Sequence, residues 1–159
     1  MLGDGHRRSE LMRIGLFIGP VASWIFPRMQ AMPSWNDELT HAIISCALHV
    51  HNTLGPGFHE RIYCRALRIE LQKRGFAVEL ETHIPIRYDG KLIGSHRLDM
   101  LIQNSVIVEA KNVDALTRVH YAQARSYLEA TGLRRALLVN FAGERVDIRR
   151  IQNPITKRK

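Results

Sequence analysis

The segment from Arg97 to Lys111 reads RLDMLIQNSVIVEAK, and it decides the fold that we expect for this chain. Two runs rich in apolar and β-branched residues flank a short polar link, Gln-Asn-Ser at 103–105. This pattern predicts two strands, Lys91–Ile102 and Val106–Lys111, that pair as an antiparallel hairpin. We expect the turn to centre on Asn104, which fixes the register of the pair.

The hairpin in this register brings three ionisable side chains together. Asp99 and Glu109 lie opposite one another across the pair, and Glu109 and Lys111 share a face because side chains alternate along a strand. Opposed like charges cost roughly 0.2–1 kcal/mol even on a wet sheet, so a cation is expected to neutralise them. Carboxylate oxygens with a nearby carbonyl and open water positions suit Mg²⁺ or Mn²⁺, which acidifies a bound water and polarises a phosphodiester oxygen. Lys111 would orient the attacking water or offset charge developing on the phosphate.

A D…ExK pattern alone is a weak signal, and a surface ion pair explains it as well. In that interpretation Asp99 pairs with Arg97 or Lys111, and Glu109 is an ordinary strand residue. The histidines at 49, 51, 83 and 96 do not favour a transition-metal site, because no Cys or carboxylate stands at a supporting interval. Solvated or packed histidines are the better expectation.

The rest of the chain supplies the remaining layers of one domain. Before the hairpin we expect a helix capped by Asn36 or Asp37, a helix over Phe58–Arg74 closed by Gly75, and a strand region over Ala77–Tyr88 ending at an Asp89-Gly90 turn. After the hairpin we expect a helix over Thr117–Ala130 ended by Gly132, a central strand at Ala136–Phe141 and an edge strand at Glu144–Ile151. This order predicts an α/β fold in which a mixed β-sheet is flanked by helices.

Two of these helices place polar side chains among apolar ones. Glu60 shares a stripe with Cys64, Leu67 and Leu71 in the second helix, although a rotated helix would leave this acid exposed. In the third helix, residues 120, 123 and 127 (His, Gln and Tyr) share one face, which points at the sheet or forms a polar rim on an amphipathic helix.

The net charge of +8 says little about the partner, because most of it lies at the ends of the chain. Residues 36–148 carry 14 Lys or Arg side chains against 13 Asp or Glu, a net of +1. The tail from residue 149 carries five basic side chains and no acid. A solvated basic tail is common, so the local arrangement of residues must decide the question. The most obvious basic candidates near the predicted site are arginines on helices, at positions 61, 65, 68, 118 and 125.

The length of 159 residues with 45% apolar content suits one domain at residues 36–152, with an N-terminal extension at 1–35 and a basic tail at 153–159. The extension contains an apolar run, Ile14–Phe26, that is too short and too interrupted to span a bilayer. We expect a poorly ordered extension or a start-site artefact, with Met29 or Met32 as the true first residue. Two cysteines without metal-ligand spacing fit a reducing, cytoplasmic location without a membrane partner.

Several motifs together resemble a known family. The stretch Gly57–Tyr63 (GFHERIY) resembles the signature of the small bacterial GxxExxY family, and so, in order and spacing, do Arg97–Ile102, Val106–Lys111, His120–Leu128 and Leu137–Phe141. The resemblance covers residues 37–152. That family belongs to the PD-(D/E)XK nuclease-like superfamily, whose fold is the restriction-endonuclease-like mixed sheet.

The resemblance implies roles for six residues. Members of the superfamily bind a divalent metal, Mg²⁺ or Mn²⁺, through an acid on one strand and the acid of ExK on the next, and Asp99, Glu109 and Lys111 take those places. Glu60 resembles the additional metal-binding acid that many members supply from the helix ahead of the sheet. Gln123 and Tyr127 resemble the Gln-x-x-x-Tyr that lines the site in exonuclease-like branches. The proline of the superfamily's name is absent, because residue 98 is a leucine, but this position varies among members.

The sequence therefore predicts a hydrolase, a divalent-metal-dependent nuclease acting on nucleic acid, most simply DNA. An alternative from another class is a nucleic-acid or protein interaction module that keeps the nuclease fold without turnover, which the near-neutral domain favours. A third possibility is a metal-dependent enzyme that acts on a phosphoester outside nucleic acids.

Overall fold

The structure is a computed structural model that describes residues 38–153. The predicted extension, the Asn36 or Asp37 cap and nearly all of the predicted basic tail lie outside these residues. In chain order the elements are α1 (Glu38–Leu54), α2 (Glu60–Lys73), β1 (Val78–Tyr88), β2 (Lys91–Ile102), β3 (Val106–Lys111), α3 (Arg118–Thr131), β4 (Arg135–Asn140) and β5 (Asp147–Gln152). The predicted order of helices and strands is confirmed, and so are the bounds of the two hairpin strands.

The strands form one five-stranded mixed sheet in the order β1-β2-β3-β4-β5. The pairs β1/β2, β2/β3 and β4/β5 are antiparallel, whereas β3 and β4 are parallel and are connected through α3. β4 is buried along its whole length, as expected for a strand covered on both faces. This mixed sheet flanked by helices is consistent with the predicted restriction-endonuclease-like fold.

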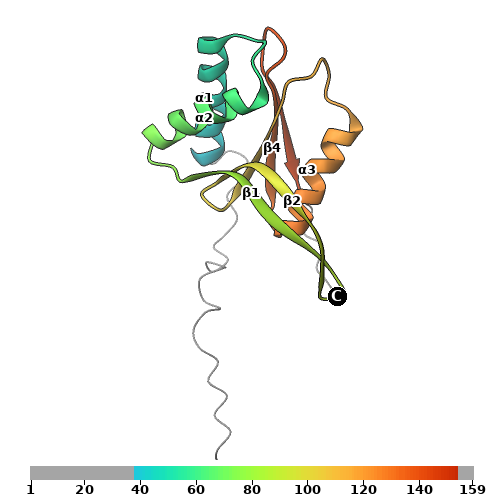
Figure 1. Ribbon diagram of the computed structural model, residues 1–159. Coiled ribbons are helices and arrows are strands. Elements are labelled where there is room, and N and C mark those ends of the chain that lie inside the picture. The colour runs from blue at the N-terminus through green and yellow to red at the C-terminus, as the bar shows by residue number, and fades with distance from the viewer. Residues whose placement is uncertain (1–37, 154–159) are drawn as a thin grey trace, which may run out of the picture. The chain divides into compact units, whose positions relative to one another are not determined.

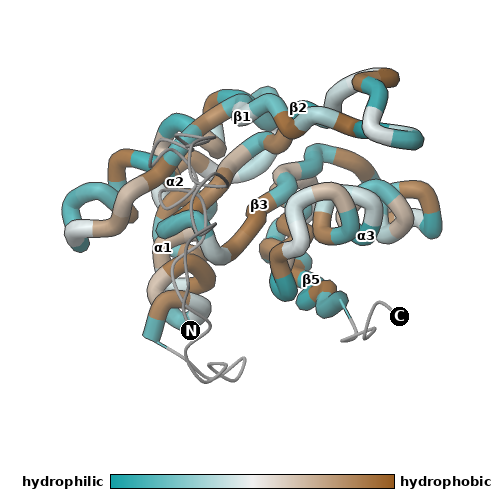
Figure 2. The backbone as a smooth tube through the Cα atoms, turned by 90° about the horizontal axis from the view of Figure 1, so that it is seen from below, coloured by the Kyte–Doolittle hydropathy of each residue, from teal (hydrophilic) through white to brown (hydrophobic). Residues whose placement is uncertain are grey.

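Helices cover both faces of the sheet, so the described residues 38–153 form two apolar cores (Figures 1 and 2). On one face, Met100, Val108 and Leu137 of the sheet pack with buried residues of α1 and α2. On the other face, Ile107 and Leu138 pack with buried residues of α3. The predicted alternation holds along β3 and the inner part of β2, because Met100 and Val108 pack on the opposite face from Leu101 and Ile107. It breaks at Asp99, because Leu98 packs with the α3 residues although it is two residues from Met100.

The helix ends follow the predicted cap residues. After α2, the Gly75 N–H donates to the Gln72 carbonyl (2.9 Å) and the Phe76 N–H donates to the Leu71 carbonyl (3.1 Å). This pair of bonds is a Schellman motif, and Gly75 takes the positive φ of 83° that it requires. Gly132 likewise ends α3 in the left-handed conformation, with φ at 71°.

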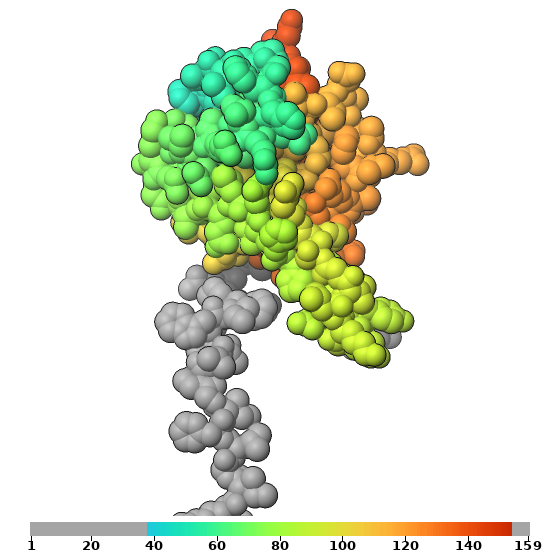
Figure 3. All heavy atoms as spheres, viewed as in Figure 1, coloured from blue at the N-terminus to red at the C-terminus, as the bar shows by residue number. Residues whose placement is uncertain are grey.

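The partial burial that alternates along β1 ends before its last two residues. The β1/β2 register shifts between Ile86 and Arg87, where β2 carries one extra residue, and Tyr88 beyond the shift is 74% exposed. The predicted turn is confirmed, because Asp89 and Gly90 both have positive φ, as a tight hairpin turn requires. The β1–β2 hairpin extends beyond the body of the domain (Figure 3).

The remaining differences are small. α2 begins at Glu60 rather than Phe58, because residues 58 and 59 belong to the bend that precedes the helix. β4 begins and ends one residue earlier than predicted, and β5 begins at Asp147 rather than Glu144.

Candidate active site

The candidate site lies where β2 separates from β3. Paired residues of the two strands run from Ile102↔Val106 to Met100↔Val108, the register that follows from a turn centred on Asn104. Asp99 is the next residue outward, and its carboxylate Oδ2 accepts a hydrogen bond from the Ala110 N–H at 2.9 Å. The Asp99 side chain thus reaches β3 beside Glu109.

Glu109 is a carboxylate almost wholly removed from water, with a side chain 2% exposed. Its Oε1 accepts a hydrogen bond from Lys111 Nζ at 2.7 Å. Its Oε2 is buried and has no hydrogen-bond partner. Burial, followed by the charge of Asp99, raises the pKa of Glu109 to about 7 against the opposing effect of Lys111. An unpartnered, buried carboxylate oxygen is a feature that calls for an external partner.

The pKa values of Asp99 and Lys111 are also shifted by burial and by the nearby charges. Burial raises the pKa of Asp99, although the Ala110 N–H and the Lys111 ammonium oppose the shift. Burial would lower the pKa of Lys111, but the hydrogen bond and charge of Glu109, with the charges of Asp99 and Glu60, raise it instead. Lys111 is therefore a fixed cation at the end of β3.

Glu60 joins α2 to the end of β3. It lies in the first turn of α2, and its Oε1 accepts a hydrogen bond from the Asn112 N–H at 3.0 Å. The loop beyond is held by Asn140 of β4, which accepts from the Val113 N–H (3.1 Å) and donates to the Val113 carbonyl (2.6 Å). These bonds fix the chain directly after Lys111.

Tyr63, which follows Glu60 by one helical turn, anchors this end of α2. Its ring is fully buried and stacks on Phe141 with centroids 4.4 Å apart. Its hydroxyl donates to the Gly55 carbonyl at 2.7 Å and accepts from the Phe58 N–H at 3.2 Å. The bend before α2 is thereby fixed, and the position of Glu60 with it.

Helix α3 contributes Gln123 and Tyr127 from the other side. The Gln123 amide donates to the Tyr127 hydroxyl at 2.7 Å, so the two side chains act as one unit. Burial, followed by the charge of Glu109, raises the pKa of Tyr127, as expected for a phenol close to the carboxylates. His120 does not join them, because its ring Nδ1 accepts the Thr117 N–H at 3.0 Å and completes the cap of α3.

His96 is a neighbour of the site that sequence reasoning missed. Its ring lies edge-on to Tyr127 with centroids 4.8 Å apart. Strict alternation would put His96 and Leu98 on the face of Met100, but Leu98 packs among the α3 residues, so the period of β2 gave no signal for this contact.

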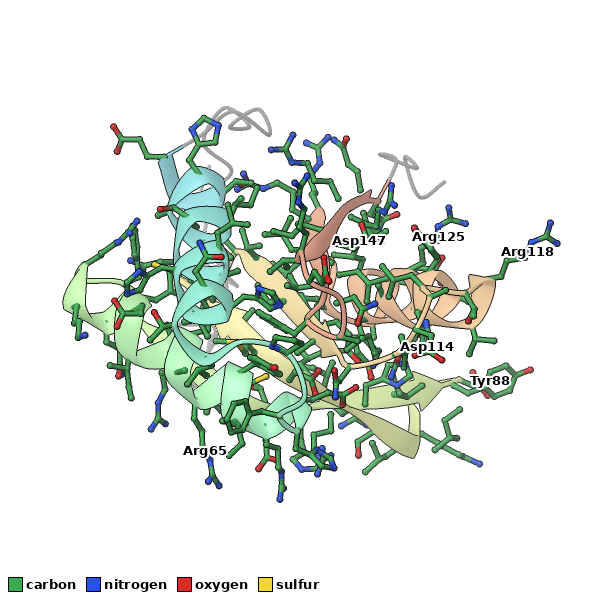
Figure 4. The ribbon with its side chains drawn as sticks, turned by 90° about the horizontal axis from the view of Figure 1, so that it is seen from above. Arg65, Tyr88, Asp114, Arg118, Arg125 and Asp147 are labelled. Atoms are coloured by element: carbon green, nitrogen blue, oxygen red, sulfur yellow. The ribbon has the colours of Figure 1, made fainter. Side chains whose placement is uncertain are left out.

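A hollow of about 530 Å³ opens beside the carboxylates, and we call it the α2 hollow. Its wall includes Glu60, Arg61, Arg65, Arg68, Arg97 and Asp99. Three of the five arginines expected near the site are thus present. Arg118 and Arg125 instead project from α3 on the opposite side of the molecule from Arg65 (Figure 4).

The carboxylates fit a hard divalent cation with an incomplete protein shell. Within residues 38–153, no three His, Cys, Asp or Glu side chains are grouped closely enough to hold a metal ion. Mg²⁺ commonly binds through one or two carboxylates and keeps several waters. Asp99 and the free Oε2 of Glu109 could supply those two ligands, whereas Glu60 already accepts the Asn112 N–H and stays a predicted third.

Comparison with known proteins agrees with this geometry. The family model of the PD-(D/E)XK nuclease superfamily matches residues 37–151. The chain belongs to the PD-(D/E)XK nuclease superfamily. The superfamily is one of nucleases, whose members typically use divalent metals.

The other comparisons add less. No curated protein matches the chain. The crystal structure of SSO0001 is similar with a TM-score of 0.42 and 17% sequence identity, over 70% of this chain and 63% of that one. The chain thus matches less than two thirds of that protein's length. In the described part of the chain, none of the helices combines the length and the apolar character that a membrane span requires.

Proposed function

We propose that this protein is a divalent-metal-dependent nuclease that hydrolyses phosphodiester bonds, with DNA as its substrate. The observation that carries the proposal is the state of Glu109. A carboxylate 2% exposed, with one oxygen bonded to Lys111 and the other without a partner, is unfavourable unless a cation completes it. Superfamily membership supports the same chemistry.

Asp99 and Glu109 hold Mg²⁺ or Mn²⁺ in this proposal. When bound, such an ion supplies Lewis-acid chemistry, because it makes water more acidic and polarises a phosphoryl oxygen. Lys111, held by Glu109 and kept protonated by the surrounding carboxylates, orients the attacking water or offsets charge on the phosphate.

The remaining three residues complete the site. Glu60 is an accessory acid and a third candidate ligand, and its hydrogen bond to the Asn112 N–H keeps it near the end of β3. Gln123 and Tyr127 line the site from α3, where their mutual hydrogen bond limits their rotation. Gly57–Tyr63 and its companion motifs support membership of the bacterial GxxExxY family within the superfamily. The domain bounds 36–152 and a cytoplasmic location also belong to this proposal.

Cleavage assays with matched variants test the proposal. Purified protein with Mg²⁺ or Mn²⁺ is mixed with single- and double-stranded DNA and RNA, and cleavage of DNA is expected. Asp99→Ala and Lys111→Ala should abolish cleavage while circular dichroism still reports a folded domain. Asp114→Ala, an exposed loop acid, is the control and should retain cleavage. If the wild type binds no Mg²⁺ or Mn²⁺ and cleaves none of the substrates, the proposal is refuted.

A second candidate is an interaction module that keeps the nuclease fold without turnover. One observation favours it, the net charge of +1 over residues 36–148, because a nuclease normally presents a basic surface to the phosphate backbone. Crystals soaked in Mn²⁺ separate the two candidates. An anomalous peak between Asp99 and Glu109 favours the enzyme, and its absence together with nucleic-acid or protein binding that survives Asp99→Ala favours the module.

A further inference from the structure

The α2 hollow presents arginines directly beside the candidate catalytic carboxylates. Arg61, Arg65 and Arg68 are spaced four and three residues apart, so they form one ridge along α2. Asp99 lies in the same hollow, so a ligand that contacts this ridge also lies near the site.

Two of the hollow's four arginines already have an acidic partner. Arg61 Nη2 donates to Glu81 Oε1 at 2.6 Å, and Arg97 Nη1 lies 3.9 Å from the same oxygen. Glu81 thus serves Arg61 and Arg97 together. These two side chains shape the hollow more than they attract a ligand.

Within residues 38–153, Arg65 and Arg68 have no bonded acidic partner, although the hydrogen bond from Arg61 and, to a smaller extent, the charge of Arg65 lower the pKa of Glu81. Among the described residues, neither guanidinium has a hydrogen bond or an ion pair, and the buried Nε of Arg68 is without an acceptor. Buried donors are almost always satisfied in folded proteins, so this one shows that the Arg68 guanidinium lacks an internal partner at Nε. Arg65 and Arg68 both line the hollow, where an acceptor from outside can meet their side chains. A guanidinium presents its donors in a fork that matches a phosphate oxygen pair.

We propose that Arg65 and Arg68 bind the backbone phosphates of a nucleic-acid strand that lies in the α2 hollow. The inference rests on the proposed function, because it places the strand next to the phosphodiester that reaches Asp99. The strand leaves the site between α2 and the β1–β2 pair. Backbone phosphates carry no base identity, so binding here is independent of sequence.

Binding measured without metal tests this inference separately from catalysis. A fluorescein-labelled single-stranded DNA 20-mer is titrated with the full chain in EDTA, and anisotropy is followed at several salt concentrations. Arg65→Gln/Arg68→Gln should lower the slope of log affinity against log salt by about 1.4, which is roughly twentyfold weaker binding near 0.1 M salt. Arg65→Gln alone, at an exposed position, should lower the slope by about 0.7.

Arg118→Gln/Arg125→Gln is the matched control, because it removes the same charge from exposed positions on α3. Its slope should stay near that of the wild type. Equal slopes for the two double variants, or a wild type that binds no DNA at low salt, would overturn the inference. Wild-type protein that binds with the expected slopes but cleaves nothing in Mg²⁺ or Mn²⁺ contradicts the proposed enzymatic function and leaves this binding site standing.

Discussion

Replacing Asp99 by Asn should stabilise the metal-free protein and remove its response to Mg²⁺. The amide oxygen can still accept the Ala110 N–H that Asp99 Oδ2 accepts at 2.9 Å, so the main structural change is the loss of one negative charge. That charge is the second cause, after burial, of the raised pKa of Glu109.

The magnitude follows from the pKa of Glu109. A pKa of about 7 instead of 4.5 means that ionising Glu109 costs the folded protein about 3 kcal/mol. Asp99 accounts for the smaller part, so Asp99→Asn should add about 1 kcal/mol to the free energy of unfolding at pH 8 in EDTA. For a domain of this size, that raises Tm by about 4 °C.

With Mg²⁺ bound, the wild type should become more stable than Asp99→Asn, which reverses their order of stability in EDTA. At a Mg²⁺ concentration 100 times its Kd, the wild type gains about 2.7 kcal/mol, or about 10 °C in Tm, whereas Asp99→Asn gains little. Thermal unfolding followed by circular dichroism, with and without Mg²⁺, measures both effects. Asp114→Asn at an exposed position is the control and should behave as the wild type. A variant that is less stable than the wild type in EDTA, or that keeps the full Mg²⁺ response, would refute the reasoning.

Three further predictions concern acidity, thiols and packing. In EDTA, the free energy of unfolding should fall by at most about 3 kcal/mol as pH rises from 4.5 to 7, because the folded protein holds the Glu109 proton more tightly than the unfolded chain. Urea titrations measure this dependence, and Glu109→Gln should flatten it. A wild-type stability that rises over this pH range would contradict the prediction. Burial raises the pKa of Cys64 to about 12 and also raises the pKa of Cys46. Neither thiol should therefore react with a thiol reagent at pH 8 until the protein is unfolded. Rapid labelling of the native protein would count against this prediction. Leu138→Ala should cost 2–5 kcal/mol in urea unfolding because the side chain is fully buried in the α3 core, whereas Val119→Ala, 72% exposed, should change stability by less than about 0.5 kcal/mol.

The sequence predicted the hairpin well because two independent signals agreed. Period-two alternation fixed the faces, and the polar link at 103–105 fixed the turn, so the register centred on Asn104 followed. The C-terminal end of α2 was also predicted from the sequence, because Gly75 takes a positive φ that other residues avoid.

The features that escaped prediction depend on contacts between distant elements or on irregular backbone. His96 meets Tyr127 only because β2 and α3 pack together, and single-sequence patterns carry no such pairing. Tyr88 is exposed near the turn of the β1–β2 hairpin, and nothing in local composition marks the register shift at Ile86/Arg87. His120 has helical spacing that fits the site, but capping Thr117 gives it a different partner.

The same limit applies to the arginines. Helical periodicity identified five candidates, yet it could not orient α2 and α3 relative to the sheet. The packing puts Arg65 and Arg68 at the α2 hollow and turns Arg118 and Arg125 away from Arg65.

The parallel pairing of β3 with β4 has a consequence for synthesis on the ribosome. Val106 to Glu109 are buried, and β4 is the neighbour that completes the hydrogen bonding of β3, but β4 follows α3 in the chain. A nascent chain that has emerged only through Thr131 therefore exposes an apolar, unpaired strand edge, which invites association with other chains. We expect truncated products ending between α3 and β4 to aggregate, and chaperone binding to be greatest at that length.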